Sequence, residues 1–151
     1  MRIPAILAAA AFIAVSPANA AEIAPVDDVV NSAAMCILSA GRDGTDTSRF
    51  DTEAWAPHGR GYRHKTVPIS IEFPTDDDGI SRICVVHAML RDQDEQKEIV
   101  TRLNSMLGSK PLKQSASQVW MVSTASGPRG IQFFTDQDSD QPQVRLIGAA
   151  F

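Results

Sequence analysis

Residues 55–65 contain most of the side chains that are suited to binding a ligand or to catalysis. Two aromatic residues, two histidines and three basic residues occur there: Trp55, His58, Arg60, Tyr62, Arg63, His64 and Lys65. Guanidinium groups beside aromatic rings are suited to binding an anion or an acidic protein surface. We therefore expect these seven residues to form a binding site for an anionic ligand or an acidic partner, with Arg42 and Arg49 able to add to it. The alternative is a loop packed by its aromatic residues, whose cations balance acids elsewhere.

Metal binding is not expected. The chain has three histidines, and a zinc site needs three or four converging ligands. His58 and His64 lie in a glycine-containing segment, whereas His87 lies within a hydrophobic run. Residues 136–140 resemble the start of a calcium loop, but Gln141 and Ile147 stand where the loop needs Gly and Glu. This acidic segment and residues 76–79 are interpreted as solvated turns, and no metal or cofactor is predicted.

Catalytic motifs are missing from the sequence. Residues 124–127 lack the glycine that precedes the serine of a nucleophile elbow, and residues 108–110 do not form a phosphate-binding loop. No catalytic residue is therefore assigned, and a non-enzymatic binding protein is favoured. One alternative is a small hydrolase or metal-dependent enzyme that uses His58, His64 or His87. Such an enzyme needs a pocket in which a histidine meets a carboxylate or a hydroxyl. Another is a structural protein of the cell envelope that has no ligand.

The composition is that of a folded globular protein with an acidic balance. Hydrophobic residues make up 44% and charged residues 21% of the 151 residues. The net charge of −4 argues against nucleic acid as a partner, because nucleic-acid-binding proteins usually carry a basic excess.

The first twenty residues have the pattern of a signal peptide. Arg2 precedes an apolar run over residues 3–15, and small residues at Ala18 and Ala20 suit a signal peptidase. The apolar run is shorter than the roughly 20 residues that a membrane-spanning helix needs. Cleavage after Ala20 leaves residues 21–151 as one domain with no membrane span. The expected location is periplasmic or secreted.

Cys36 and Cys84 are the only cysteines, and both follow the predicted signal peptide. An even number of cysteines in an exported protein indicates a disulfide. A Cys-x-x-Cys redox motif is absent from the sequence. We therefore expect a structural Cys36–Cys84 bridge.

Hydrophobic periodicity predicts two helices and five strands. The helices are expected over residues 25–40 and 92–107, and the second has a buried stripe of Ile99, Val100, Leu103, Met106 and Leu107. The strands are expected over 67–73, 80–90, 118–124, 130–135 and 143–151. Pro68 suggests that the first strand lies near a sheet edge, and apolar residues on both faces make the second central.

Residues 41–66 show no sustained period, and at most a short helical turn near residues 51–55 is expected there. The short turns elsewhere imply antiparallel pairing. The predicted fold is therefore α+β in the order α-β-β-α-β-β-β, with both helices on one face of a mainly antiparallel sheet of about five strands.

Overall fold

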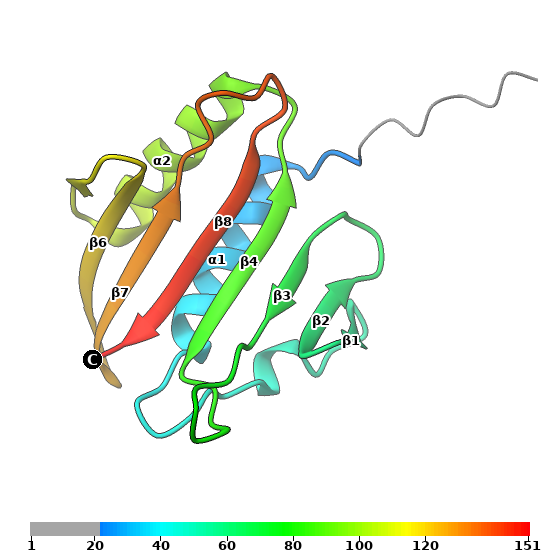
Figure 1. Ribbon diagram of the computed structural model, residues 1–151, viewed down its shortest axis with the longest axis vertical. Helices are drawn as coiled ribbons and strands as arrows, with labels where there is room; N and C mark the ends of the chain where they lie inside the picture. Colours follow the sequence, from blue (N-terminus) through cyan, green and yellow to red (C-terminus); the bar gives the residue numbers. More distant parts are fainter. Residues whose placement is uncertain (1–21) are drawn as a thin grey trace, which may run out of the picture.

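A computed structural model describes residues 22–151 of the protein, so the predicted signal peptide lies outside the described residues. Two helices pack on one face of a single eight-stranded antiparallel sheet (Figure 1). This confirms the α+β class, whereas the predicted number of strands is wrong. In chain order the elements are α1 (Val26–Ser39), the 3-10 turn η1 (Ser48–Phe50), β1 (Trp55–His58), β2 (Gly61–His64), β3 (Ser70–Glu72), β4 (Ile83–Met89), α2 (Gln93–Leu107), β5 (Leu112–Lys113), β6 (Ser117–Thr124), β7 (Gly127–Phe134) and β8 (Gln143–Ala150).

The sheet has the spatial order β1-β2-β3-β4-β8-β7-β6-β5. The C-terminal strand β8 therefore lies between β4 and β7, where it joins the two halves of the sheet (Figure 1). The central position predicted for residues 80–90 is confirmed, because β4 pairs with β3 on one side and with β8 on the other.

Both predicted helices form within a residue of the expected bounds. The side chain of Asp92 caps α2 by accepting hydrogen bonds from the backbone N–H groups of Asp94 and Glu95, both at 3.0 Å. Ile99 and Leu103 are fully buried, as the apolar stripe predicts. Met106 is instead 40% exposed, because it lies on the last turn of α2 at the rim of a groove.

Residues 41–66 differ most from expectation. The segment has no helical turn near residues 51–55; η1 comes earlier, and a β-hairpin of β1 and β2 follows. This hairpin occupies the sheet edge, so β3 is an interior strand and the edge position suggested by Pro68 is wrong. Its strands have four residues each and carry polar and proline residues, so they show no strand period.

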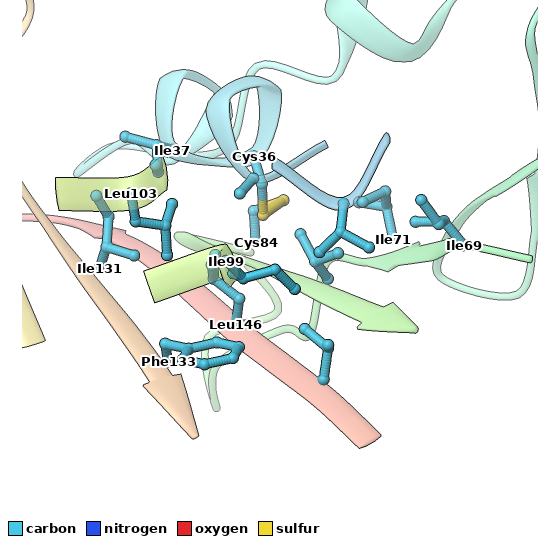
Figure 2. Packing of buried hydrophobic residues seen from close by; sticks show 14 of the residues in the cluster. Cys36, Ile37, Ile69, Ile71, Cys84, Ile99, Leu103, Ile131, Phe133 and Leu146 are labelled. Atoms are coloured by element: carbon cyan, nitrogen blue, oxygen red, sulfur yellow. A yellow bond between two sulfur atoms is a disulfide. The ribbon is translucent and has the colours of Figure 1, made fainter. Parts of the chain in front are cut away.

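The disulfide is confirmed. Cys36 on α1 is bonded to Cys84 on β4, with 5.3 Å between their Cα atoms, and both residues are fully buried (Figure 2). The bridge belongs to a buried cluster that includes residues of both helices and of the central strands, among them Ile37, Ile99, Ile131, Phe133 and Leu146 (Figure 2). The bridge therefore fixes α1 to the middle of the sheet.

The helices leave the other face of the sheet uncovered (Figure 1). We call this second surface the open face. Strand alternation and the pairing registers place the side chains of Arg63, Ser70, His87, Arg145 and Phe134 in one row across it. Within residues 22–151, no helix is long and apolar enough to cross a bilayer.

Candidate functional site

The predicted binding residues lie on the β1–β2 hairpin. Trp55 pairs with His64 and His58 pairs with Gly61, which leaves Gly59 and Arg60 as a two-residue turn. Gly59 has a φ of 56°, a conformation that glycine adopts without steric cost. Position 61 requires glycine for a different reason. A Cβ atom there would clash with the carbonyl oxygen of Ile71 on β3. These two glycines allow a tight turn and a close approach of β2 to the sheet.

The hairpin divides the aromatic residues from the cations. Trp55 is only 6% exposed and packs edge-on against Phe50, with 5.2 Å between ring centroids. Tyr62 stacks on Phe50 at 5.5 Å, and its hydroxyl donates a hydrogen bond of 2.9 Å to Asp51. The aromatic residues thus anchor the hairpin to η1 and the core.

The cations remain at the surface. Arg60, Arg63 and Lys65 are all exposed. Arg63 lies 3.7 Å from Glu22, and both of these side chains are exposed, so the pair contributes at most about 1 kcal/mol. Among residues 22–151, no carboxylate oxygen lies within 4.0 Å of the charged nitrogens of Arg60 or Lys65. The packed aromatic residues and the Arg63–Glu22 pair fit the structural interpretation of this segment, whereas the exposed Arg60 and Lys65 fit the binding interpretation.

Two hollows flank Arg63. The larger has a volume of about 580 Å³ and is lined by Arg63, His64 and Lys65 together with Glu22, Ile23, Ala56, Thr66, Val67 and Pro68. The smaller has about 170 Å³ and is lined by His58, Arg63, Pro68, Ile69 and Ser70. The structure therefore brings Arg63, His64 and Lys65 together in one cleft. It places His58 in the adjoining hollow, while Arg60 projects from the turn and lines neither.

His64 holds the end of the hairpin. Its Nδ1 accepts hydrogen bonds from the backbone N–H groups of Thr66 and Val67, each at 3.2 Å. Its ring lies edge-on to Trp55, with 4.8 Å between ring centroids. His64 thus lines the cleft and also fixes the backbone that shapes it.

The sheet adds residues that sequence reasoning did not join to the hairpin. In the open-face row, Arg63 faces Ser70, which faces His87, which faces Arg145. His87 Nε2 lies 3.2 Å from Glu72 Oε2, and Arg145 lies over the ring of Phe134, 4.8 Å from its centroid. The alternation of side chains along each strand could have predicted which residues share a face with His87 or with Arg145. It could not have predicted that both lie in one row with Arg63, because that depends on the pairing register of four strands.

The carboxylates of the two acidic turns have different partners within the protein. Asp76 and Asp78 form ion pairs with Arg82, at 2.7 and 2.6 Å. The hydrogen bond from Arg82, helped by one from the backbone of Ile80, lowers the pKa of Asp78 to about 2. In the other turn, Asp136 accepts hydrogen bonds from the backbone of Asp138 and Gln143. In residues 22–151, no three His, Cys, Asp or Glu side chains lie close enough together to hold a metal ion.

Comparison with known proteins identifies no relative. The chain matches no protein-family model, no curated protein and no solved structure. The functional argument therefore depends on the geometry of the residues themselves.

Proposed function

We propose that this protein is an exported, non-enzymatic binding domain whose β1–β2 hairpin binds an anionic ligand or an acidic partner. The observation that carries the proposal is the cleft of about 580 Å³ lined by Arg63, His64 and Lys65, with Arg60 exposed on the adjoining turn. The whole chain has a net charge of −4, so a local group of cations is a departure from its general charge. Exposed guanidinium groups that lack a strong acidic partner can form charge-assisted hydrogen bonds with an incoming anion.

Two features support export. The N-terminal sequence has the order of positive, apolar and small residues that a signal peptidase recognises. The buried Cys36–Cys84 disulfide is typical of proteins that fold in an oxidising compartment. The periplasm or the extracellular space is the location consistent with both.

Binding is tested with two probes, inorganic phosphate as a small anion and an oligoglutamate peptide as an acidic partner. We expect one of the probes to bind the mature protein and to bind more weakly as salt rises, because screening reaches about 10 Å at 0.1 M. The double variant Arg60→Ala and Arg63→Ala should weaken that binding at least tenfold.

The matched control removes two cations at the opposite edge of the sheet, through Lys110→Ala and Lys113→Ala. Both lysines are exposed, and among the described residues neither has a carboxylate within ion-pair distance. This control should bind as the wild type does. Equal loss in both double variants, or binding of neither probe, would contradict the proposal. A pull-down from periplasmic extract with the same variants then identifies the natural partner.

A histidine-dependent hydrolase is the second candidate, because Ser70, His87 and Glu72 lie together on the open face. His87 contacts Glu72 at 3.2 Å, and Ser70 is its direct cross-strand neighbour. Hydrolysis of p-nitrophenyl acetate that disappears in both Ser70→Ala and His87→Ala would support this candidate. Activity at the level of free imidazole, unchanged by Ser70→Ala, would exclude it.

A further inference from the structure

Strand β6 has a free edge over the second half of its length (Figure 1). On the side away from β7 it pairs with the two-residue strand β5, through Val119 with Leu112 and Gln118 with Lys113. The pairing stops at Val119, so in the described part of the chain residues 120–124 have a neighbouring strand only on the β7 side. An unpaired strand edge is a surface to which another strand can add.

The backbone groups of Met121 and Ser123 point towards this free edge. Along an antiparallel strand, alternate residues direct their hydrogen bonds to opposite sides. Ser117 identifies the outward set, because its carbonyl accepts a hydrogen bond of 2.8 Å from the backbone N–H of Gln114, which lies outside β7. Residues 119, 121 and 123 follow at intervals of two and point the same way. Val119 is used by β5, whereas within residues 22–151 the N–H and C=O groups of Met121 and Ser123 have no backbone partner.

Exposed apolar side chains flank this edge on both faces of the sheet. On the open face, Met121 is exposed and the ring of Phe151, also exposed, lies next to its sulfur. On the helix face, Leu38 and Met106 are exposed and line a groove of about 260 Å³ with Val122. Single exposed apolar residues are ordinary on protein surfaces, whereas a group of them at one place marks an interaction site.

An added strand is the occupant that fits this arrangement. The two apolar groups lie on opposite faces of the sheet, so a helix or a membrane surface laid on one face could cover only one of them. The N–H and C=O groups between them need hydrogen-bond partners once they are covered. A strand in the plane of the sheet supplies those partners, and its side chains alternate between the two faces.

A second copy of β6 matches this edge in register. Antiparallel pairing about a two-fold axis at Val122 places Met121 of each copy opposite Ser123 of the other. These are the two residues whose backbone groups point outward, so each of those groups gains a partner. The free length, residues 120–124, is centred on the same axis, and a two-fold interface uses the same surface on both copies.

The edge also lacks the residues that prevent such pairing. Residues 120–124 are Trp, Met, Val, Ser and Thr, with no charged residue and no proline. At the opposite edge of the sheet, β1 contains Pro57 and its hairpin carries Arg60 and Lys65. Lysine and proline are residues with which proteins protect a sheet edge. Pairing of the β6 edge with itself therefore brings no like charges together within the paired strands.

We propose that the mature protein forms a two-fold dimer in which β6 pairs with β6 of a second copy, antiparallel and centred on Val122. The two sheets join into one, and Leu38, Met106 and Met121 of both copies come together at the interface. The two β1–β2 hairpins lie at the far edges of the joined sheet. The inference thus goes beyond the proposed function and does not depend on it.

The mass of the mature protein in solution tests the dimer. Sedimentation velocity and light scattering should give twice the mass of one chain. Val122→Lys should raise the dimer dissociation constant at least tenfold, because it places two lysines directly opposite each other at the axis. Ile80→Lys is the matched control, since Ile80 is also an exposed apolar residue but lies outside the β6 edge, and it should leave the dimer unchanged.

A charge exchange tests the pairing at the axis. Val122→Glu alone should weaken the dimer as Val122→Lys does, because like charges again meet. An equal mixture of the two variants should restore the dimer, because opposite charges then face each other across the axis. The restored dimer would also show that both variants fold.

A cysteine at the axis tests the register in a nearly unaltered protein. At this type of antiparallel pair the Cα atoms lie about 4.5 Å apart, within the range of about 4.4–6.8 Å that a disulfide needs. Val122→Cys should therefore form a disulfide between two copies under mild oxidation, since Cys36 and Cys84 are already bonded to each other. Thr124→Cys is the matched control on the same face of β6. Its two copies lie four positions apart along the paired strands, about 14 Å, and should not bond.

Four outcomes would overturn the inference. They are a wild-type protein that stays monomeric up to the concentrations used for nuclear magnetic resonance, a dimer that Val122→Lys does not weaken, a mixture of the Lys and Glu variants that stays monomeric, and a disulfide that forms equally well at positions 122 and 124. Each of them leaves the proposed binding function intact, because the β1–β2 hairpin lies at the opposite edge of the sheet.

Discussion

The imidazole of His64 lies edge-on to the indole of Trp55 across the β1–β2 hairpin, with 4.8 Å between the ring centroids. The two residues are direct cross-strand partners, and His64 also accepts backbone hydrogen bonds from the two residues Thr66 and Val67. One side chain therefore joins both hairpin strands to the connection that follows them. The side chain of its neighbour Arg63 lies on the open face, so the structural role of His64 and the proposed binding role of Arg63 belong to adjacent positions of the same strand.

Replacement of His64 by alanine should destabilise the protein. The change removes an acceptor for two N–H groups and an aromatic contact, each worth about 0.5–1.5 kcal/mol. We expect a loss of about 1–3 kcal/mol in the free energy of unfolding, measured by urea denaturation. His58→Ala is the control, because His58 is exposed and a surface change of this kind stays within about 0.5 kcal/mol. Equal effects of the two variants would contradict the role assigned to His64.

Removal of the disulfide should have a larger effect. Cys36 and Cys84 are 48 positions apart in sequence, and loss of a native disulfide from a small domain costs about 2–5 kcal/mol. Urea denaturation of the Cys36→Ala/Cys84→Ala variant should show this loss as a lower midpoint. Reduced wild-type protein should shift in the same direction. An unchanged midpoint in the reduced protein would show that the bridge does not support the fold.

The turn at Asp78 should give the protein an acid-dependent contribution to stability. The pKa of Asp78 is lowered from 3.8 to about 2, chiefly by its hydrogen bond from Arg82. A group whose pKa is lower in the folded state stabilises that state above its unfolded pKa, and the contribution is lost as pH falls through the folded value. The stabilisation should therefore be complete above pH 3.8 and should disappear as pH falls towards about 2.

Urea denaturation across that pH range tests the contribution. Asp78→Asn should be less stable than the wild type above pH 3.8 and should approach it towards pH 2. Asp77→Asn is the control, since among the described residues Asp77 forms no ion pair with Arg82. If the free energies of unfolding of the wild type and Asp78→Asn differ by the same amount at every pH in this range, the prediction is contradicted.

The mature protein should begin at Ala21. Cleavage after Ala20 leaves 131 residues, and intact-mass measurement of protein recovered from the periplasm should give the mass of that chain. Ala20→Arg should block cleavage and leave the precursor uncut, because the peptidase requires a small residue there. Exported wild-type protein that retains Met1 would contradict the assignment.

The sequence was sufficient to predict the elements whose signals are local. The cap at Asp92 and the alternation before Phe73 are contained within a few residues, and the bridge followed from there being only two cysteines. The β1–β2 hairpin was missed because its strands are short and partly exposed, and because its stability comes from Phe50 and Tyr62 packing together. Tertiary contacts of this kind leave no period in the sequence.

The arrangement of the candidate-site residues could be predicted only in part, for the same reason. Exposure of Arg60 and Arg63 agrees with their polar character, but the burial of Trp55 depends on contacts with η1. The row that joins Arg63 to Arg145 spans residues 82 positions apart in sequence, and it exists only in one register of the sheet. A shift of one residue would move either side chain to the opposite face.

The place of β8 between β4 and β7 has a consequence for the order of folding. In the folded sheet, strands β1–β4 are joined to strands β5–β7 only through residues 143–150, so each half has an unpaired edge without β8. Synthesis or translocation proceeds from the N-terminus, so the strand that closes the sheet arrives last. The whole sheet can therefore form only after β8 has been synthesised. A chain truncated before β8 should expose two strand edges and aggregate rather than form a smaller stable domain.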